Sequence, residues 1–336
     1  MQGGALEYRQ VLRAVTEAEP ATRWQRRFAA TWPGYRRWYL RPDRTPRPDR
    51  ATAERMVLRH MPELAATYHR LVDLTGQDET AARFLSLWNP PRFLPGCSQL
   101  ALARPWPVLC RNYDYAPDLF EAVVYSTRFT GRRVLGMADC LWGLLDGMND
   151  AGLAVSLAFG GRAGCGEGFG IPLVVRYLLE VAETTAQARE VLVRLPVSMS
   201  YNLTIIDATG TVVTAYLDPG GPPEFSASGA ATNHRGEPPD DPERAQGLRS
   251  VQRRSALLGL AAHQPGTTEL VTAFLADPLY NTGFSRAFGT LYTALYRPTA
   301  GFVDLHWPGR RWRRGFDDPD ATRTVTLREP DPLLVR

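Results

Sequence analysis

A chain of 336 residues, 44% of them hydrophobic, is long enough to bury one large core, with or without a helical annex, without disulfides or structural metals. Its net charge of +4 comes from acids and bases interleaved along most of the sequence, which argues against a nucleic-acid partner. The sequence contains no lysine, so Schiff-base catalysis, Ser/Lys dyads and lysine-bearing phosphate loops are excluded.

Patterns typical of targeting, membrane insertion and metal binding are missing from the sequence. Residues 1–7 lack the pattern of a signal peptide and no apolar run is long enough to span a bilayer, so we expect a cytoplasmic protein without a membrane partner. The cysteines form no CxxC pair, and the histidines show no paired ligand spacing. We therefore expect no metal, no disulfide and no bound cofactor.

The first part of the chain has the apolar spacing of helices. Residues 5–87 form two helical blocks separated by a proline-rich stretch at residues 41–50. The apolar positions of the first block are Leu6, Val11, Leu12, Val15, Trp24, Phe28 and Trp32. We expect residues 1–96 to be one helical layer preceding the rest of the fold.

After Asn89-Pro90-Pro91 the pattern changes to short strands with turn residues between them. Residues 98–103 and 108–111 flank Arg104-Pro105-Trp106-Pro107 as a hairpin, and residues 123–129 and 134–137 suggest another. Further along we expect a strand at 152–159, helices from Ile171 and from Thr185, a hairpin of 202–206 with 211–216, helices at 248–262 and 267–276, and strands at 288–296, 301–307 and 322–327.

Strands that neighbour one another through hairpins, with helices interspersed, predict antiparallel sheets stacked face to face and covered by helices. The expected fold is therefore α+β, a four-layer αββα sandwich over residues 97–336. One cluster is ambiguous: Arg310, Arg311, Arg313 and Arg314 around Trp312 fit either a solvated turn or an anion-binding site.

The segment Gly96-Cys97-Ser98 carries the candidate nucleophile. It combines an unhindered residue, a thiol and the start of a strand. Attack of the thiol on the carbonyl of Gly96 forms a thioester through a five-membered ring, and water then releases a free α-amine on Cys97 that can act as the base. An isolated cysteine in this position is otherwise a buried core residue.

The segment Arg111-Asn112-Tyr113-Asp114 lies where the hairpin turned at residues 105–107 returns beside Cys97. Arg111 can stabilise a thiolate, and Asp114 can accept hydrogen bonds from a cationic α-amine. Without the cysteine, this Arg-x-x-Asp spacing is an ordinary surface pair.

Two later segments supply further candidates. Asn233, at the end of an expected strand, can donate its amide N–H to an oxyanion, although a turn-forming asparagine is the ordinary alternative. His234 is a further candidate because it adjoins Asn233 in the sequence. Arg253, near the start of a helix, can order the surroundings of the candidate nucleophile.

In this chain order, these segments resemble the acyl-CoA:isopenicillin N acyltransferase-like family of N-terminal nucleophile hydrolases, and more distantly penicillin V acylase and conjugated bile acid hydrolase. The matching segments are Met61-Pro62-Glu63-Leu64, Gly96-Cys97-Ser98, Arg111-Asn112-Tyr113-Asp114, Asp146-Gly147-Met148-Asn149, Gly170-Ile171-Pro172, residues 202–210, Thr232-Asn233-His234 and residues 250–253.

The resemblance implies roles for individual residues. Cys97 corresponds to the nucleophile, Arg111 and Asp114 to its electrostatic partners, Asn233 to an oxyanion donor and Arg253 to a supporting charge. Bile acid hydrolases have an asparagine where this chain has Leu157-Ala158-Phe159, so here Ala158 can offer only its backbone, and bile salts are disfavoured as substrates.

The resulting hypothesis is a self-processing cysteine amidohydrolase or acyltransferase. Cleavage between Gly96 and Cys97 separates a fragment of residues 1–96 from a catalytic fragment of residues 97–336, and the two remain packed together. Its substrates are small amides or acyl donors, with acyl-CoA as a candidate co-substrate. The alternative is a non-catalytic acyl- or peptide-binding protein with the same fold.

Overall fold

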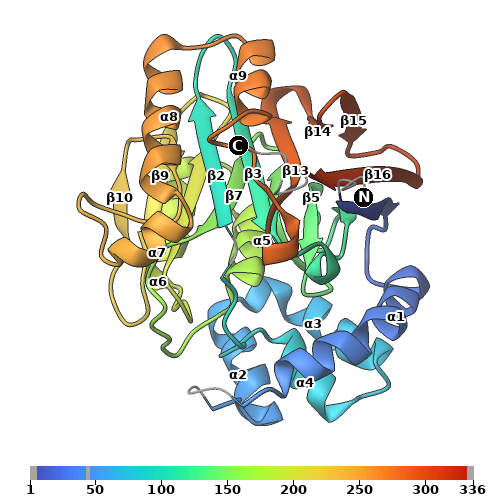
Figure 1. Cartoon of the computed structure of the whole chain (residues 1–336). Coiled ribbons are helices and arrows are strands. Elements are labelled where there is room, and N and C mark those ends of the chain that lie inside the picture. The colour runs from blue at the N-terminus through green and yellow to red at the C-terminus, as the bar shows by residue number, and fades with distance from the viewer. Residues whose placement is uncertain (1–5, 43–45, 95, 331–336) are drawn as a thin grey trace.

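The structure, a computed structural model, describes residues 6–42, 46–94 and 96–330. In this part of the chain, two stacked β-sheets lie between two helical layers (Figure 1). A further group of helices, α1–α4, packs against one end of the sandwich. The four-layer αββα arrangement predicted from the hairpin pattern is confirmed.

The larger sheet has nine strands, and its neighbours are antiparallel except for the parallel pair of β1 and β4. In spatial order the strands are β10 (Glu224–Ser226), β9 (Val212–Leu217), β8 (Tyr201–Ile206), β7 (Ala154–Phe159), β6 (Gly143–Asn149), β5 (Val134–Asp139), β4 (Val123–Thr127), β1 (Leu6–Thr16) and β16 (Ala321–Glu329).

The smaller sheet has seven strands. Its order is β11 (Ala230–Ala231), β2 (Gly96–Leu102), β3 (Val108–Tyr115), β13 (Phe288–Arg297), β14 (Phe302–Trp307) and β15 (Arg310–Gly315), with β12 (Thr282–Gly283) paired to β13. β2 is buried along its whole length and β3 along nearly all of it, because one face of this sheet meets the larger sheet and the other meets helices.

Helices cover the outer faces of both sheets. The larger sheet is covered by α5 (Ile171–Val181) and α6 (Thr185–Arg194), and the smaller by α8 (Ser250–His263) and α9 (Thr267–Phe274), with α7 (Pro242–Gly247) beside α8. The end layer comprises α1 (Thr22–Tyr39), α2 (Arg50–His60), α3 (Ala65–Leu74) and α4 (Glu79–Leu85). Single 3-10 turns lie at Pro62–Leu64, Pro117–Leu119, Phe284–Arg286 and Pro298–Ala300.

Tryptophan side chains join the end layer to the sandwich. The Trp24 indole of α1 donates a hydrogen bond to the carbonyl of Leu141 at 3.1 Å, and the Trp142 indole donates to the carbonyl of Leu85 at 2.9 Å. Both indoles are buried, so each N–H needs its carbonyl partner. The helical layer is thus held to the sandwich by directional contacts as well as by apolar packing.

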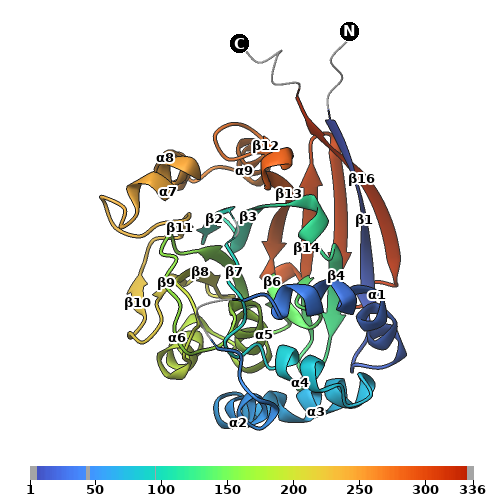
Figure 2. The same cartoon turned by 60° about the horizontal axis from the view of Figure 1, so that its bottom comes forward.

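The prediction that the chain begins with a helix is wrong. Residues 6–16 form strand β1, which lies between β4 and β16 (Figure 2). Leu12 and Ala14, two residues apart, are buried, as a strand requires, and Leu6 pairs with Glu329 at the far end of the chain. A partner more than 300 residues away leaves no local trace in the sequence.

The arginine-rich cluster near the C-terminus is a strand, not a turn. In β15, Arg311 and Arg313 bind the carboxylate of Asp304 on β14 at 3.1 and 2.9 Å. The guanidinium of Arg323 on β16 donates to the carbonyl of Arg311 at 3.1 Å. These contacts give the arginines a structural explanation at the edge where the two sheets approach each other.

Candidate active site

Strands β2 and β3 bring the predicted nucleophile and its partners together. In their antiparallel register, Cys97 lies opposite Tyr113, and Gly96 lies opposite Asp114. The hairpin predicted from the turn at residues 105–107 is therefore confirmed. Side chains alternate along each strand, so Cys97 and Arg111 face the larger sheet, whereas Asp114 faces the helices.

The thiol of Cys97 is held by Arg111. The Arg111 Nη2 atom lies 2.8 Å from the Cys97 Sγ atom, and neither side chain has any exposed surface. Arg111 also donates to the carbonyls of Leu157 at 3.1 Å and Leu145 at 3.2 Å, both from the larger sheet. The guanidinium is thereby fixed in the orientation that points one N–H at the sulfur.

A buried carboxylate balances the charge of Arg111. Asp146 on β6 forms an ion pair with Arg111, and both side chains are completely buried. The hydroxyls of Tyr292 and Tyr296 on β13 donate to the same carboxylate. Asp146 belongs to a segment that the sequence resemblance includes, but its role was not predicted, because it reaches Arg111 from the opposite sheet.

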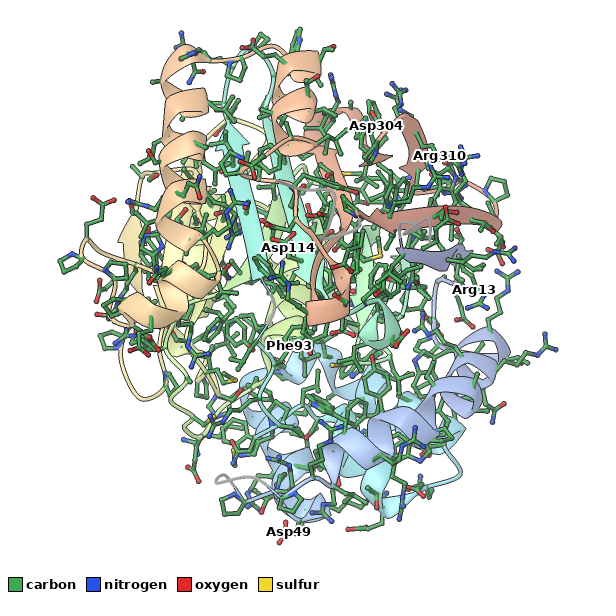
Figure 3. All side chains as sticks on the ribbon, in the orientation of Figure 1. Arg13, Asp49, Phe93, Asp114, Asp304 and Arg310 are labelled. Atoms are coloured by element: carbon green, nitrogen blue, oxygen red, sulfur yellow. The ribbon has the colours of Figure 1, made fainter. Side chains whose placement is uncertain are left out.

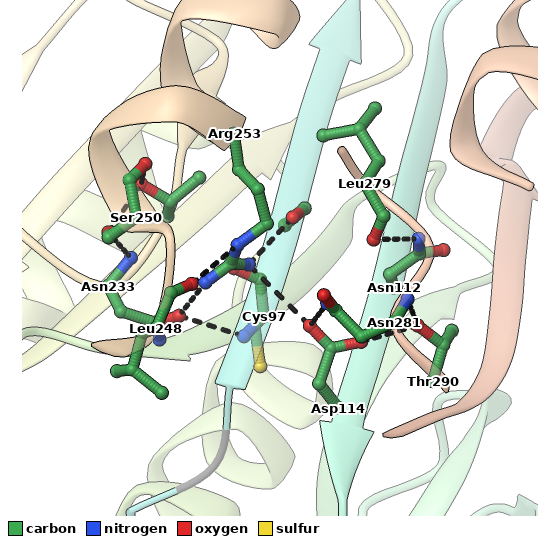
Figure 4. Close-up of polar contacts among 12 residues, drawn as sticks. Cys97, Asn112, Asp114, Asn233, Leu248, Ser250, Arg253, Leu279, Asn281 and Thr290 are labelled. Atoms are coloured by element: carbon green, nitrogen blue, oxygen red, sulfur yellow. Dashed lines mark hydrogen bonds and ion pairs between the residues drawn. The ribbon is translucent and has the colours of Figure 1, made fainter. Parts of the chain in front are cut away.

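Asp114 occupies the other face of the small sheet. Its carboxylate accepts hydrogen bonds from Asn281 at 2.8 Å and Thr290 at 2.7 Å, and lies 3.6 Å from Nη1 of Arg253 (Figure 4). In this uncleaved chain Asp114 is linked to Cys97 through Arg253, which binds the Cys97 carbonyl. Asp114 lies beside Gly96, the residue before Cys97.

A β-bulge in β13 serves both faces of the site. The pairing with β3 shifts between Thr290 and Tyr292, so Thr290 lies opposite Asp114 and Tyr292 lies opposite Tyr113. Residues two apart in a regular strand point to the same side, but the extra residue sends Thr290 to Asp114 and Tyr292 to Asp146.

The backbone of Cys97 is bound by Asn233 and Arg253. The Cys97 N–H donates to Oδ1 of Asn233 at 3.0 Å, and Arg253 Nη2 donates to the same oxygen at 2.7 Å. Arg253 Nη1 donates to the Cys97 carbonyl and, at 2.8 Å, to the hydroxyl of Ser98. Figure 4 shows Arg253 spanning the space between Asn233 and Asp114.

Asn233 is itself oriented by two further contacts. Its side-chain amide donates to the carbonyl of Phe159 at 3.0 Å, and its backbone N–H donates to the hydroxyl of Ser250 at 2.9 Å. The amide N–H expected to serve an oxyanion is thus engaged with Phe159 in the intact chain. Oδ1 of Asn233 instead accepts from the backbone nitrogen of Cys97.

His234 contacts this network at its edge. Its Nδ1 atom lies 2.7 Å from the hydroxyl of Ser250, so it supports Asn233 through Ser250 and does not touch Cys97. Burial, assisted by the nearby Arg254, lowers the pKa of His234 to about 4. The imidazole is therefore neutral near pH 7.

The backbone groups of Ala158, which we expect to offer a contact to the site, point away from Cys97. It lies opposite Asn202 of β8. The carbonyls of its neighbours Leu157 and Phe159 face Arg111 and Asn233, and backbone groups alternate in direction along a strand. The backbone groups of Ala158 therefore point toward β8.

Burial controls the protonation of the central groups. It raises the pKa of the Cys97 thiol to about 11, even though Arg111 acts in the opposite direction. It also raises the pKa of Asp114, which Arg253 partly offsets. In the intact chain, Cys97 is thus a neutral thiol near pH 7.

A pocket of about 480 Å³ opens next to this network. Three of its lining residues also contact the site: the Leu248 carbonyl accepts from Arg253 Nε at 3.0 Å, Asn281 binds Asp114, and the Phe288 ring lies 5.7 Å from the Arg253 guanidinium. The other lining residues are Gly247, Arg249, Asp277, Tyr280, Thr282, Gly283 and Arg286.

Phe93 lies near the site and shortly before Cys97 in the sequence. The Phe93 ring packs against Tyr115 with ring centroids 5.5 Å apart, and the Phe93 carbonyl accepts a hydrogen bond from the Tyr201 hydroxyl at 2.8 Å. In Figure 3, Phe93 lies between the helical end layer and Asp114. These contacts hold Phe93 in place.

The described residues show neither a metal-binding cluster nor a membrane-spanning helix. No cluster of three or more histidine, cysteine, aspartate or glutamate side chains there has the arrangement of a metal site. Among the described helices, none has both the length and the apolar character of a membrane span.

The sequence matches the profile of a known family over residues 103–312, which is more than half of the chain. That family is the acyl-coenzyme A:6-aminopenicillanic acid acyl-transferase family. The chain belongs to this acyltransferase family. Arg111, Asp114, Asn233 and Arg253 lie within the matched range, whereas Cys97 lies six residues before its start. Comparison with curated protein sequences gives no match.

Several solved structures resemble this acyltransferase-family chain at low identity. A conjugated bile acid hydrolase variant from Clostridium perfringens is 13% identical over 68% of this chain and 96% of its own, with a TM-score of 0.48. An N-acylethanolamine-hydrolyzing acid amidase ortholog from Caenorhabditis elegans is 15% identical over 61% and 93%, with a TM-score of 0.45. Penicillin V acylase from Agrobacterium tumefaciens is 13% identical over 68% and 82%, with a TM-score of 0.38.

Proposed function

We propose that this member of the acyltransferase family is a self-processing cysteine amidohydrolase or acyltransferase, and that Cys97 is its nucleophile. One observation carries the proposal: three polar groups of Cys97 each have a dedicated partner. Arg111 binds the sulfur, Asn233 accepts from the nitrogen and Arg253 donates to the carbonyl. A buried core cysteine needs no guanidinium at its sulfur, and its backbone groups ordinarily pair with a neighbouring strand and not with charged or amide side chains.

The same arrangement supports the proposal of self-processing. The Cys97 sulfur adds to the carbonyl carbon of Gly96, the carbon–sulfur bond forms, and the peptide bond to the Cys97 nitrogen breaks. The thiol proton is transferred to that nitrogen, which leaves as the new α-amine. Water then hydrolyses the thioester, giving a Gly96 carboxylate and restoring the thiol. The products are fragments of residues 1–96 and 97–336.

The freed amine supplies the base that the intact chain lacks. It is positioned to donate to Oδ1 of Asn233, which already accepts from the same nitrogen, and it can take the thiol proton at the start of turnover. Arg111 stabilises the thiolate that results. The carboxylates of Asp146 and Asp114 balance Arg111 and Arg253.

Turnover repeats the thioester chemistry on an external acyl donor. The thiolate attacks an acyl carbonyl, the bond to the leaving amine or thiol breaks, and water or an amine then takes the acyl group from sulfur. Acyl-CoA thioesters and linear amides are the donor classes we propose, in keeping with the acyltransferase family.

Intact-mass spectrometry of the purified protein tests the proposal. We expect two polypeptides with the boundary between Gly96 and Cys97, and one acyl adduct on the second when an activated acyl ester is added. The Cys97→Ala variant should stay uncut and unlabelled. The Cys110→Ala variant is the matched control, because Cys110 is equally buried on the neighbouring strand. This variant should cleave normally. An uncut protein that binds acyl compounds without forming an adduct would instead be a non-catalytic binding protein.

A further inference from the structure

Phe288 leaves no room for a side chain on the residue before the nucleophile. A Cβ atom built on Gly96 would lie 2.4 Å from Cε2 of the Phe288 ring, and 3.1 Å from Cβ of Asp114. Carbon atoms that are not bonded do not approach to 2.4 Å, so one of the groups would have to move. Gly96 does not have a left-handed backbone conformation, so glycine is required here by space and not by φ.

The Phe288 ring is held in this position by several contacts. Phe288 begins β13, where its backbone pairs with Gly283 of β12. The Arg253 guanidinium lies 5.7 Å from the ring centroid. The next residue, Gly289, is covered by Phe284, whose Cδ1 atom would lie 2.0 Å from a Cβ built there. The backbone of Phe288 is thus fixed by its neighbours, while the half-buried ring lines the pocket beside Asn281.

The α-carbon of Gly96 has a chemical counterpart in every acyl donor. During self-processing, the Gly96 carbonyl becomes the acyl group of a thioester on Cys97, and its Cα is the carbon next to that carbonyl. During turnover, the thioester on the same sulfur places the donor's own α-carbon at this position. The contact that excludes a methyl group from the side-chain position of Gly96 then excludes a donor branch that points the same way.

We propose that Phe288 excludes acyl donors whose α-carbon carries a branch in the position of an L-amino-acid side chain, and that the same ring requires glycine at position 96. The first half rests on turnover at Cys97 and the second is read from self-processing, so both rest on the proposed function. Phe288 is a specificity-determining residue in both steps. The excluded class comprises acyl groups with that configuration, such as N-acetyl-L-alanyl.

A double-mutant cycle on self-processing tests the second half. The fraction cleaved is followed by intact mass for the parent chain, Gly96→Ala, Phe288→Ala and the double variant. We expect Gly96→Ala to slow cleavage by at least about tenfold in the parent but by less than about threefold when residue 288 is alanine. An equal slowing in both backgrounds overturns the proposed contact. Phe288→Leu, with an intermediate effect expected, replaces Phe288→Ala if the latter does not fold.

Three matched esters test the first half. The processed enzyme is given the p-nitrophenyl esters of N-acetylglycine, N-acetyl-L-alanine and N-acetyl-D-alanine, which share a leaving group and differ only at the α-carbon. We expect a preference of at least about tenfold in kcat/KM for the glycyl over the L-alanyl ester, falling below about threefold in Phe288→Leu. The same preference in both proteins overturns the proposal.

The two experiments separate the proposal from the function on which it rests. If Cys97 of the processed enzyme is acylated equally by all of the esters, the role of Cys97 as nucleophile stands and the proposed selectivity is wrong. A chain that neither cleaves nor forms an adduct on Cys97 overturns both.

Discussion

The buried ion pair between Arg111 and Asp146 gives the sharpest test of how the site is built. Replacing Asp146 with asparagine keeps the size of the side chain and removes its charge. Arg111 then remains as a guanidinium with no exposed surface and no carboxylate partner. The asparagine also presents only one acceptor oxygen to the hydroxyls of Tyr292 and Tyr296, which both donate to Asp146.

The expected loss of stability follows from that uncompensated charge. Breaking a buried ion pair by removing one partner costs about 3–5 kcal/mol. For a chain of 336 residues, the unfolding entropy is about 0.7 kcal/mol per kelvin, so a loss of about 4 kcal/mol lowers Tm by about 6 °C. The same substitution at Asp317, which is bound to Arg133 but 76% exposed, should change stability by less than about 1 kcal/mol.

Both substitutions are best compared in the Cys97→Ala chain, which is expected to remain a single polypeptide. Urea and thermal unfolding followed by circular dichroism give the free energies and Tm values. In the cleavable chain, Asp146→Asn should also slow self-processing, because Arg111 is no longer held against the sulfur. If Asp146→Asn is as stable as Asp317→Asn and processes at the parent rate, the ion pair does not organise the site.

Three further predictions concern the amine site, a buried acid pair and the fragments. Asn233→Ala removes the acceptor of both the Cys97 nitrogen and Arg253 and should slow cleavage by about 10- to 100-fold in an intact-mass time course; an unchanged rate would contradict this role. Burial and the neighbouring Glu121 raise the pKa of Asp139 from 3.8 to about 7, so the folded chain retains a proton that the unfolded chain loses. Stability should therefore fall as the pH rises from about 4 to about 7, and Asp139→Asn should flatten this slope in thermal unfolding; an unaltered slope would count against it. Because β1 pairs with β4 and β16, the two fragments should co-elute in size-exclusion chromatography without denaturant, whereas separate elution would mean that this strand does not hold them together.

Much of the site could be predicted because the contacts between Cys97 and β3 lie within one hairpin. The turn at residues 105–107 fixes the hairpin, and the hairpin fixes which residues of β3 lie beside Cys97. Asn233 and Arg253 are predicted in the site through the resemblance to the family, because their local sequence alone is not specific. Alternation along β3 puts Arg111 and Asp114 on opposite faces. Asp114 is bound to Arg253 in the intact chain, and its contact with a free α-amine stays a prediction.

The contacts between layers could not be predicted from the sequence. Asp146 meets Arg111 across the two sheets, and Tyr292 reaches it through a bulge that no periodicity reveals. The apolar spacing of residues 6–16 predicts a helix, whereas pairing with β16 and β4 makes this segment a strand. The sequence does not single out Phe288. Its importance comes from the folded chain, in which its ring fills the space that a side chain at position 96 would need.

The pairing of Leu6 with Glu329 places the two ends of the described fold on adjacent strands. A short linker between them would close the chain into a ring, and opening that ring before Cys97 would give a circular permutant that starts at the nucleophile. Such a permutant would acquire its terminal amine when the initiator methionine is removed, without attacking its own backbone. Gly96 would then become the last residue of the chain, and the chemistry of turnover could be studied apart from the chemistry of maturation.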